Sequence, residues 1–304
     1  MRSRRTAPDG RSPLRSASLI ENFWALGFWL AGRLFRPNAA EWTSSGGQRV
    51  WAVAPHPDDE AIGCGGALIR HAQAGDQVCI VCVTDGRRSR ALGLSPDLMA
   101  VRREAETRAS ARALGVSRVE WLGLPEGEWV EEQLHARLES LYEQFPPHLI
   151  YAPSRIDFHP EHGRTARGLA AFLRAAIFTD PPPHIRIYPV QVPLTPLLAN
   201  LVVPVARVKA ELAAALNAYV TQSDNLARAM RQRRYAARLY RRPGLVEEFW
   251  EMTAKQYVHL HSGTVETWAT GAFRGLRHRA FTDPLAYLRG WPERKRLARV
   301  FRSF

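Results

Sequence analysis

The sequence predicts an α/β protein built on a Rossmann-like, doubly wound and mostly parallel sheet. Short apolar runs alternate with stretches of helical periodicity along most of the chain, which is typical of successive βαβ units. The apolar runs are continuous, as expected of strands buried on both faces of a parallel sheet. With 304 residues, of which 46% are hydrophobic, the chain is long enough to bury one large core.

The first predicted unit is a strand over Val50–Ala54 followed by a helix over Ala61–Ala74. Beyond Pro204 the pattern changes and predicts a helical C-terminal part, with helices at 207–219 and 223–240, whereas residues after 252 give only weak signals. Between these parts we expect strands within 76–86, 119–129, 148–157 and 185–190, and helices at 98–115, 130–145 and 162–178.

Positive charge is concentrated at the two ends of the chain. Of the net charge of +13, Met1–Arg15 contributes +4 and Gly271–Phe304 contributes +7. A nearly neutral body argues against a broad nucleic-acid surface, and basic ends are typical of tails that touch an anionic membrane or polyanion. Solvated tails without a function are the alternative. We therefore expect no nucleic-acid partner, and a basic N-terminal extension (1–47), a central domain (48–252) and a basic C-terminal extension (253–304).

The segment Leu19–Phe35 is rich in aromatic residues and carries arginines on both sides. Its uncharged stretch, Asn22–Gly32, is too short for the ~20 apolar residues that cross a bilayer. No A-x-A cleavage site of a signal peptide follows it. It suits an interfacial helix that lies on a membrane, and a helix packed on the domain's own surface is the alternative.

The three cysteines, Cys64, Cys79 and Cys82, predict a protein with reduced thiols. Cys79 and Cys82 lie within a predicted strand, where residues three apart point to opposite faces, so their C-x-x-C spacing is not expected to bind a metal or form a disulfide. Thiols packed as small hydrophobes are typical of a cytoplasmic protein. With the basic tails, this predicts a cytoplasmic protein that can associate with the inner membrane face.

Two clusters of histidine and carboxylate residues follow the first and fourth predicted strands. Because carboxyl ends of parallel strands meet at one edge of a sheet, we expect the two clusters to lie together. Histidine with carboxylates at one edge predicts a metal site. The clusters consist of His56, Asp58, Asp59 and Glu60 after the first strand and Asp157, His159, Glu161 and His162 after the fourth.

A catalytic zinc is typically held by three protein ligands and keeps one position open for water. We expect His56, Asp59 and His162 to be these ligands, with one Zn²⁺ per chain and Fe²⁺ as the alternative. Asp58 is then expected to be the general base, although Asp58 or Asp59 could instead cap a helix. His159 is expected to donate to the oxyanion or to the leaving amine.

The neighbours of these residues are expected to support them. Asp157 or Glu161 could hold the tautomer of His159, and the glycines of the "GCGG" stretch could let substrate or backbone approach closely. That stretch lacks the G-x-G-x-x-G spacing of a dinucleotide-binding turn. His259 and His261 have the spacing of a strand, but without a third ligand nearby they are not expected to bind a second metal.

Five stretches together resemble the LmbE-like, or PIG-L, zinc-dependent de-N-acetylases. They are "HPDDEAIGCGGAL", "RREAETRASARALGV", "DFHPEH", "ALNAYVTQ" and "EEFW", and they span about residues 50–250. The resemblance implies that residues 48–252 form a deacetylase domain. It also implies hydrolysis of an N-acetyl group on an N-acetylglucosamine-type glycoside or glycolipid by metal-activated water. The alternative is a membrane-peripheral or sugar-binding protein whose LmbE-like domain is not catalytic.

The resemblance also implies the roles of individual residues. The positions of His56, Asp59 and His162 match metal ligands, Asp58 matches the base and His159 matches a second catalytic histidine. Arg103 matches a substrate-binding arginine, with Arg102 as the competing choice, while Glu60, Asp157 and Glu161 are expected to bind substrate or support the ligands. The chain departs from the family in having Glu161 where aspartate is common, and in "RRSR" after "TDG".

Overall fold

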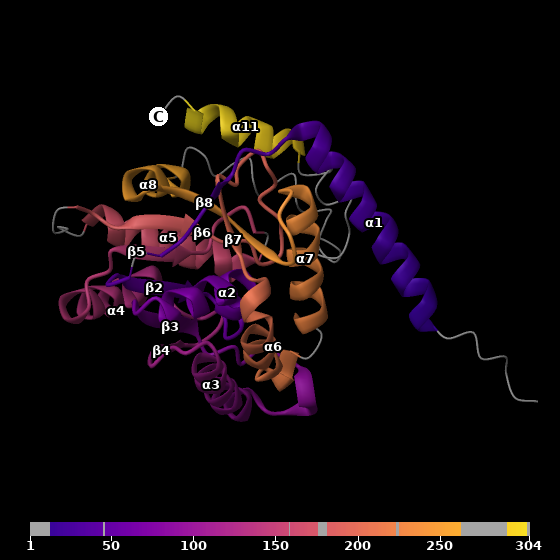
Figure 1. Ribbon diagram of the computed structural model, residues 1–304. Helices are drawn as coiled ribbons and strands as arrows, with labels where there is room; N and C mark the ends of the chain where they lie inside the picture. Colours follow the sequence, from indigo (N-terminus) through magenta and orange to yellow (C-terminus); the bar gives the residue numbers. More distant parts are fainter. Residues whose placement is uncertain are drawn as a thin grey trace, which may run out of the picture.

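The computed structural model describes residues 13–44, 46–157, 159–175, 181–222, 225–262 and 291–302. A central eight-stranded sheet has the order β1-β7-β8-β6-β5-β2-β3-β4, with helices packed around it (Figure 1). Strands β2 to β6 are mutually parallel, while β8 runs antiparallel to both of its neighbours. The expected α/β fold with a mostly parallel sheet is therefore confirmed.

The elements have the following bounds. The strands are β1 (Ala40–Glu41), β2 (Arg49–Ala54), β3 (Gln77–Thr84), β4 (Arg118–Leu124), β5 (Leu149–Ala152), β6 (His184–Ile187), β7 (Leu201–Pro204) and β8 (Val246–Thr253). The helices are α1 (Pro13–Phe35), α2 (Asp59–Gln73), α3 (Pro96–Ala113), α4 (Glu131–Gln144), α5 (Pro160–Ala175), α6 (Lys209–Asn217), α7 (Asn225–Leu239), α8 (Ala254–His261) and α11 (Trp291–Arg302). Short 3-10 turns lie at Ala91–Gly93, Ala206–Val208 and Val220–Gln222.

Alternate residues of the central strands feed two separate cores, one on each face of the sheet. On β2, Trp51 and Val53 belong to one core and Val50 and Ala52 belong to the other. All four are fully buried, which explains why the strand reads as a continuous apolar run. Helices α4 and α5 cover the first face, and α2, α3 and α6 cover the second.

The C-terminal part is less helical than the sequence predicts. Helices α6 and α7 lie where they are expected, but β7 and β8 add to the sheet and β1 pairs with β7. Strand β8 has the sequence VEEFWEMT, in which Glu247 and Glu248 are both buried. The two buried carboxylates make this strand hard to recognise from the sequence, because charged side chains normally point to solvent.

The buried Glu247 carboxylate is stabilised by hydrogen bonds and an ion pair. Glu247 accepts the backbone N–H groups of Gly66 and Ala67, both at 2.8 Å, in the middle of α2. Arg233 pairs with Glu247 and also donates to the carbonyl of Ala61 at 3.0 Å. The ion pair therefore contacts the backbone of α2 directly, which only a helix without bulky side chains on that face permits.

The glycines of α2 serve packing rather than the approach of substrate, which corrects that expectation. A Cβ at Gly63 would lie 2.1 Å from the Tyr188 ring, and one at Gly66 would lie 2.4 Å from Val205. Tyr188 cannot move away easily, since its hydroxyl donates to the carbonyl of Val53 at 2.6 Å. The close packing of these side chains against the glycines holds α2 against the sheet.

Gly63→Ala is expected to destabilise the protein by about 1–3 kcal/mol, because the added methyl group overlaps a buried ring that has no room to shift. Chemical denaturation measures the change in the free energy of unfolding. Gly163→Ala on α5 is the control, since its Cβ would meet nothing closer than Arg167 at 3.9 Å. Equal stability of the two variants would contradict the packing role of Gly63.

Described helices of both extensions pack on helices of the central domain. Helix α1 lies along α7, and α8 packs against α5 (Figure 1). His259 and His261 lie on helix α8 and not on a strand, and both ring nitrogens of His261 already have backbone partners. The arginines of residues 1–12 and the basic stretch at 271–290 lie outside the described residues. Among the described helices, none is both long and apolar enough to cross a membrane.

Candidate metal centre

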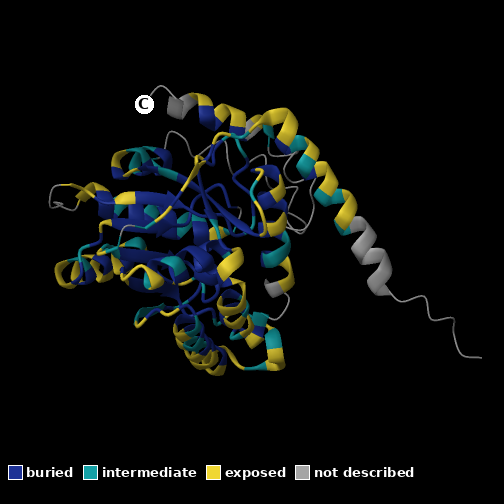
Figure 2. Ribbon diagram, viewed as in Figure 1, coloured by how far each residue is buried: buried dark blue, intermediate teal, exposed yellow. Residues whose placement is uncertain are grey.

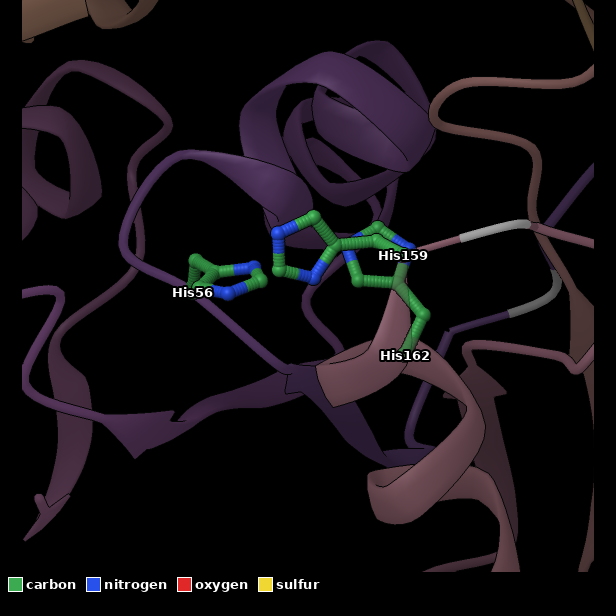
Figure 3. Close-up of side chains that lie close together, drawn as sticks. All are labelled: His56, His159 and His162. Carbon is green, nitrogen blue, oxygen red and sulfur yellow. The ribbon is translucent and has the colours of Figure 1, made fainter. Parts of the chain in front are cut away.

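The two polar clusters meet at the carboxyl edge of the sheet, as expected. Strands β2 and β5 are neighbours and parallel, so the turns that follow them emerge side by side. His56 lies in the turn between β2 and α2, and His162 lies in the first turn of α5. Ring nitrogens of His56, His159 and His162 lie within 4.8 Å of one another, and Figure 3 shows the three rings grouped together.

Asp59 lies between two of these imidazoles. Its Oδ2 atom is 3.1 Å from Nδ1 of His56 and 3.2 Å from Nε2 of His162. The same oxygen accepts the backbone N–H of His56 at 2.8 Å, which fixes the carboxylate in place. Three atoms that could bind a metal, from two distant parts of the chain, therefore lie close together.

The outer nitrogen of each imidazole faces another carboxylate. His162 Nδ1 lies 3.0 Å from Asp157, whose oxygens accept the backbone N–H groups of residues 190–192. His56 Nε2 lies 3.5 Å from Glu126, in the loop after β4. Carboxylates in this position fix the orientation of a metal-binding imidazole and raise its basicity. Glu126 was not identified as a candidate site residue from the sequence. It follows the third predicted strand, and that position was the signal that could have identified it.

His159 is oriented by backbone and not by a carboxylate, contrary to expectation. Its Nδ1 accepts the backbone N–H of Glu161 at 3.3 Å, so the neutral ring carries its proton on Nε2. The Glu161 side chain instead accepts the indole N–H of Trp129 at 2.6 Å, and Asp157 serves His162. The longer side chain at 161 is thus used to anchor Trp129.

Asp58 adopts a backbone conformation that is rare outside glycine. It precedes α2 with φ of 110°, and its side chain makes no helix-capping hydrogen bond. Its backbone N–H points to a carboxylate oxygen of Glu60 at 3.3 Å. Glu60 is fully buried and accepts the hydroxyl of Tyr219 at 2.5 Å. Glu60 therefore supports the turn that presents Asp58, and such strain is typical of functional sites.

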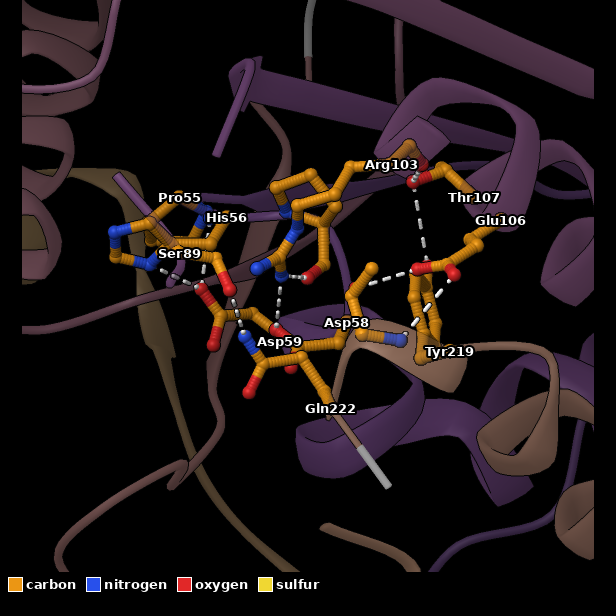
Figure 4. A network of polar contacts seen from close by, with 12 residues as sticks. Pro55, His56, Asp58, Asp59, Ser89, Arg103, Glu106, Thr107, Tyr219 and Gln222 are labelled. Atoms are coloured by element: carbon orange, nitrogen blue, oxygen red, sulfur yellow. Dashed lines mark hydrogen bonds and ion pairs between the residues drawn. The ribbon is translucent and has the colours of Figure 1, made fainter. Parts of the chain in front are cut away.

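The choice between two arginines is decided by burial. Arg103 is 3% exposed, donates to the carbonyl of Pro57 and lies 3.6 Å from Asp58 Oδ1 (Figure 4). Arg102 is half-exposed and pairs with Glu106 at 2.9 Å. Arg103 is thus the arginine that contacts the site, and it does so through Asp58.

Electrostatic effects in this cluster favour a positive charge between the carboxylates. Burial works against the charged imidazolium of His56, yet a hydrogen bond with Asp59 and the nearby Glu126 carboxylate raise its pKa to about 9. Burial opposes the charge on His162 too, but Asp59 and Asp157 raise its pKa to about 10. Burial lowers the pKa of His159 to about 3, and it raises that of Asp58 to about 7 despite Arg103.

Two separations in this set fit a zinc ion. Ligand atoms about 2.0–2.1 Å from a tetrahedral zinc lie about 3.3 Å from one another, close to the separations of 3.1 and 3.2 Å around Asp59 Oδ2. Two imidazoles and one carboxylate are a common catalytic set. The three imidazoles of His56, His159 and His162 form a second possible ligand set.

Comparisons with known proteins place this arrangement in context. Residues 51–173 match the model of the PIG-L family, described as "GlcNAc-PI de-N-acetylase". A 1D-myo-inositol 2-acetamido-2-deoxy-alpha-D-glucopyranoside deacetylase of Kineococcus radiotolerans is 28% identical, over 38% of this chain and 42% of the relative. A diacetylchitobiose deacetylase of Thermococcus kodakarensis is 26% identical, over 45% and 57%. The chain thus spans about half the length of these curated relatives.

The fold is shared with a solved deacetylase as well. The N,N'-diacetylchitobiose deacetylase from Pyrococcus horikoshii superposes with a TM-score of 0.58 and 22% identity, covering 69% of this chain and 85% of the other. The matched segment 51–173 contains both polar clusters, from His56 to His162. Residues 51–173 are therefore similar to the PIG-L, or LmbE-like, family domain.

Proposed function

We propose that this protein is a zinc-dependent hydrolase that removes the acetyl group from an N-acetylglucosamine-type glycoside or glycolipid. The observation that carries the proposal is the convergence of His56, Asp59 and His162 donor atoms beside Asp58 and His159. The family match and the names of the relatives support the amide chemistry and the sugar. Iron in place of zinc would be held by the same residues.

Zinc, when bound, lowers the pKa of water to about 7 and polarises the amide carbonyl. Asp58 accepts the proton of the attacking water, because its raised pKa suits a base that works near neutrality. Arg103 holds the Asp58 carboxylate in place. His159, neutral and protonated on Nε2, donates a hydrogen bond to the oxyanion. The protonated Asp58 then returns its proton to the leaving amine as the C–N bond breaks. Acetate and a free amine are the products.

His159→Ala is expected to keep zinc and to lower kcat by about 10²- to 10³-fold, because one donor to the oxyanion is lost. The zinc content and kcat of the purified variant are the measurements. Loss of the metal would instead make His159 a ligand, in agreement with its closeness to the other two imidazoles. An unchanged kcat with zinc present would remove His159 from the mechanism.

Hydrolysis is tested on a panel of N-acetylglucosamine glycosides, with both acetate and free amine measured for the zinc-loaded protein. The expected result is equimolar release of the two products, abolished by chelation and restored by zinc. The competing candidate, a sugar-binding protein with a non-catalytic domain, predicts saturable binding of the same glycosides without acetate. That second result would overturn the proposal.

We further propose that the enzyme acts in the cytoplasm. Its three cysteines are unpaired and buried, two of them on β3, and they behave as small hydrophobes. Burial raises the pKa of the Cys79 thiol to about 12, so this thiol stays protonated and unreactive. Trapping of thiols at lysis, followed by mass spectrometry, is expected to find all three reduced.

A further inference from the structure

Helix α1 has one face that packs on the domain. Phe28 is 6% exposed, and its ring stacks on Tyr235 of α7 at 4.8 Å between centroids. Glu21 forms an ion pair with Arg231 of α7 at 3.0 Å. A Cβ at Gly32 would overlap the backbone of Leu239, so the two helices touch closely there. Helix α1 is therefore held in a defined orientation against α7.

The opposite face of α1 exposes a continuous apolar row. Phe23, Leu26, Leu30 and Leu34 are 68%, 54%, 48% and 79% exposed. Their spacing of three and four residues places them on one side of the helix. Their exposure places this side away from the domain, and Figure 2 shows exposed residues along α1. We call these four residues the α1 ridge.

Positive charge surrounds the C-terminal end of the ridge. Arg33 and Arg36 are exposed at this end of α1. Helix α11 lies beside it, with Trp291 contacting Phe35 at 5.4 Å between ring centroids (Figure 1). Helix α11 buries Leu297, Ala298 and Arg294 and exposes Lys295, Arg296 and Arg299. The one acidic residue of α1, Glu21, is engaged on the other face.

We propose that the α1 ridge docks on an anionic lipid surface, with α1 lying flat and its ridge buried among the acyl chains. Aliphatic and aromatic side chains on one helix face, flanked by arginine and lysine, match an apolar interior beneath a layer of negative headgroups. Helix α1 cannot cross the bilayer, because its other face is attached to α7 and it is not apolar enough to span. The proposal does not depend on the deacetylase activity.

The test uses the full-length protein and sedimentation with vesicles of phosphatidylcholine, either pure or with about one third phosphatidylglycerol. Leu26→Glu combined with Leu30→Glu removes the centre of the ridge. Leu98→Glu combined with Val101→Glu is the matched control, since these α3 side chains are 59% and 68% exposed. Lys295→Glu combined with Arg299→Glu tests the charge. All four substituted positions in α1 and α3 are exposed, so the variants are expected to fold.

The unmodified protein is expected to bind the anionic vesicles and to bind more weakly at about 0.5 M salt. The ridge variant should lose at least about tenfold in the partition coefficient, the charge variant should lose binding only to anionic vesicles, and the control should be unchanged. Absence of binding by the unmodified protein would overturn the proposal. An equal loss of vesicle binding in the control variant would also overturn it. If the ridge variant changed only self-association, as measured by sedimentation equilibrium, the α1 ridge would bind a second copy of the chain, and the proposal would again be overturned.

Because binding is measured without turnover, its outcome is separate from that of the proposed function. Deacetylation of a water-soluble N-acetylglucosamine glycoside should be the same in the unmodified protein and in the ridge variant. Failure of vesicle binding with intact hydrolysis would reject the docking surface alone. Intact vesicle binding without hydrolysis would reject the enzyme alone.

Discussion

The His162→Ala variant is expected to bind zinc more weakly than the unmodified protein by more than about 100-fold. Loss of a residue that only orients a ligand typically costs 10- to 100-fold in metal affinity, and loss of the ligand itself should cost more. The variant should still fold, because Asp157 keeps the three backbone N–H groups that stabilise its buried charge. The measurements are zinc per chain after dialysis and the Kd in competition with a chelator.

His135→Ala is the control for this variant. His135 lies on α4, pairs with Glu139 at 3.1 Å and packs against the ring of Phe172 on α5, so zinc content should not change. A His162→Ala protein with one tightly bound zinc would contradict the ligand assignment. Asp59→Ala separates two ligand sets. Loss of zinc in Asp59→Ala supports His56, Asp59 and His162 as ligands, whereas loss in His159→Ala but not in Asp59→Ala supports three imidazoles.

Parallel strands made the location of the site predictable from the sequence. Each cluster directly follows an apolar run, and the parallel pairing of β2 with β5 brings the two turns together whatever the details of the loops. The same reasoning fails for β7 and β8. Strand β8 is antiparallel, and its buried Glu247 depends on Arg233, whose contribution no local pattern reveals.

The convergence of the candidate site residues was easier to predict than their hydrogen-bond partners. His56, Asp59 and His162 converge because chain direction and the helix starts force them together. The partner of Glu161 could not be predicted, because Trp129 reaches it from the loop after β4. Glu126 comes from that same loop, and its position beside His56 depends on how β4 pairs with β3. Contacts between loops are set by packing and not by periodicity.

The Asp58→Asn variant is expected to keep its zinc and to lose about 10²- to 10⁴-fold in kcat, because a general base contributes rate enhancement of this size. Asparagine is the informative replacement. It has the shape of aspartate, and it tolerates the positive φ of this position, where most other side chains would strain the turn. Asp58→Ala would combine loss of the base with a strained backbone.

The stability of Asp58→Asn distinguishes a catalytic role from a structural one. Burial raises the pKa of Asp58 to about 7, far above its usual value, so folding disfavours the charged carboxylate even with Arg103 nearby. A neutral amide avoids this penalty, and the metal-free variant should unfold at the same or a higher temperature at neutral pH. A variant that loses both activity and stability would show that Asp58 supports the fold. Lost activity in an equally stable, zinc-loaded protein is the result that only a base predicts.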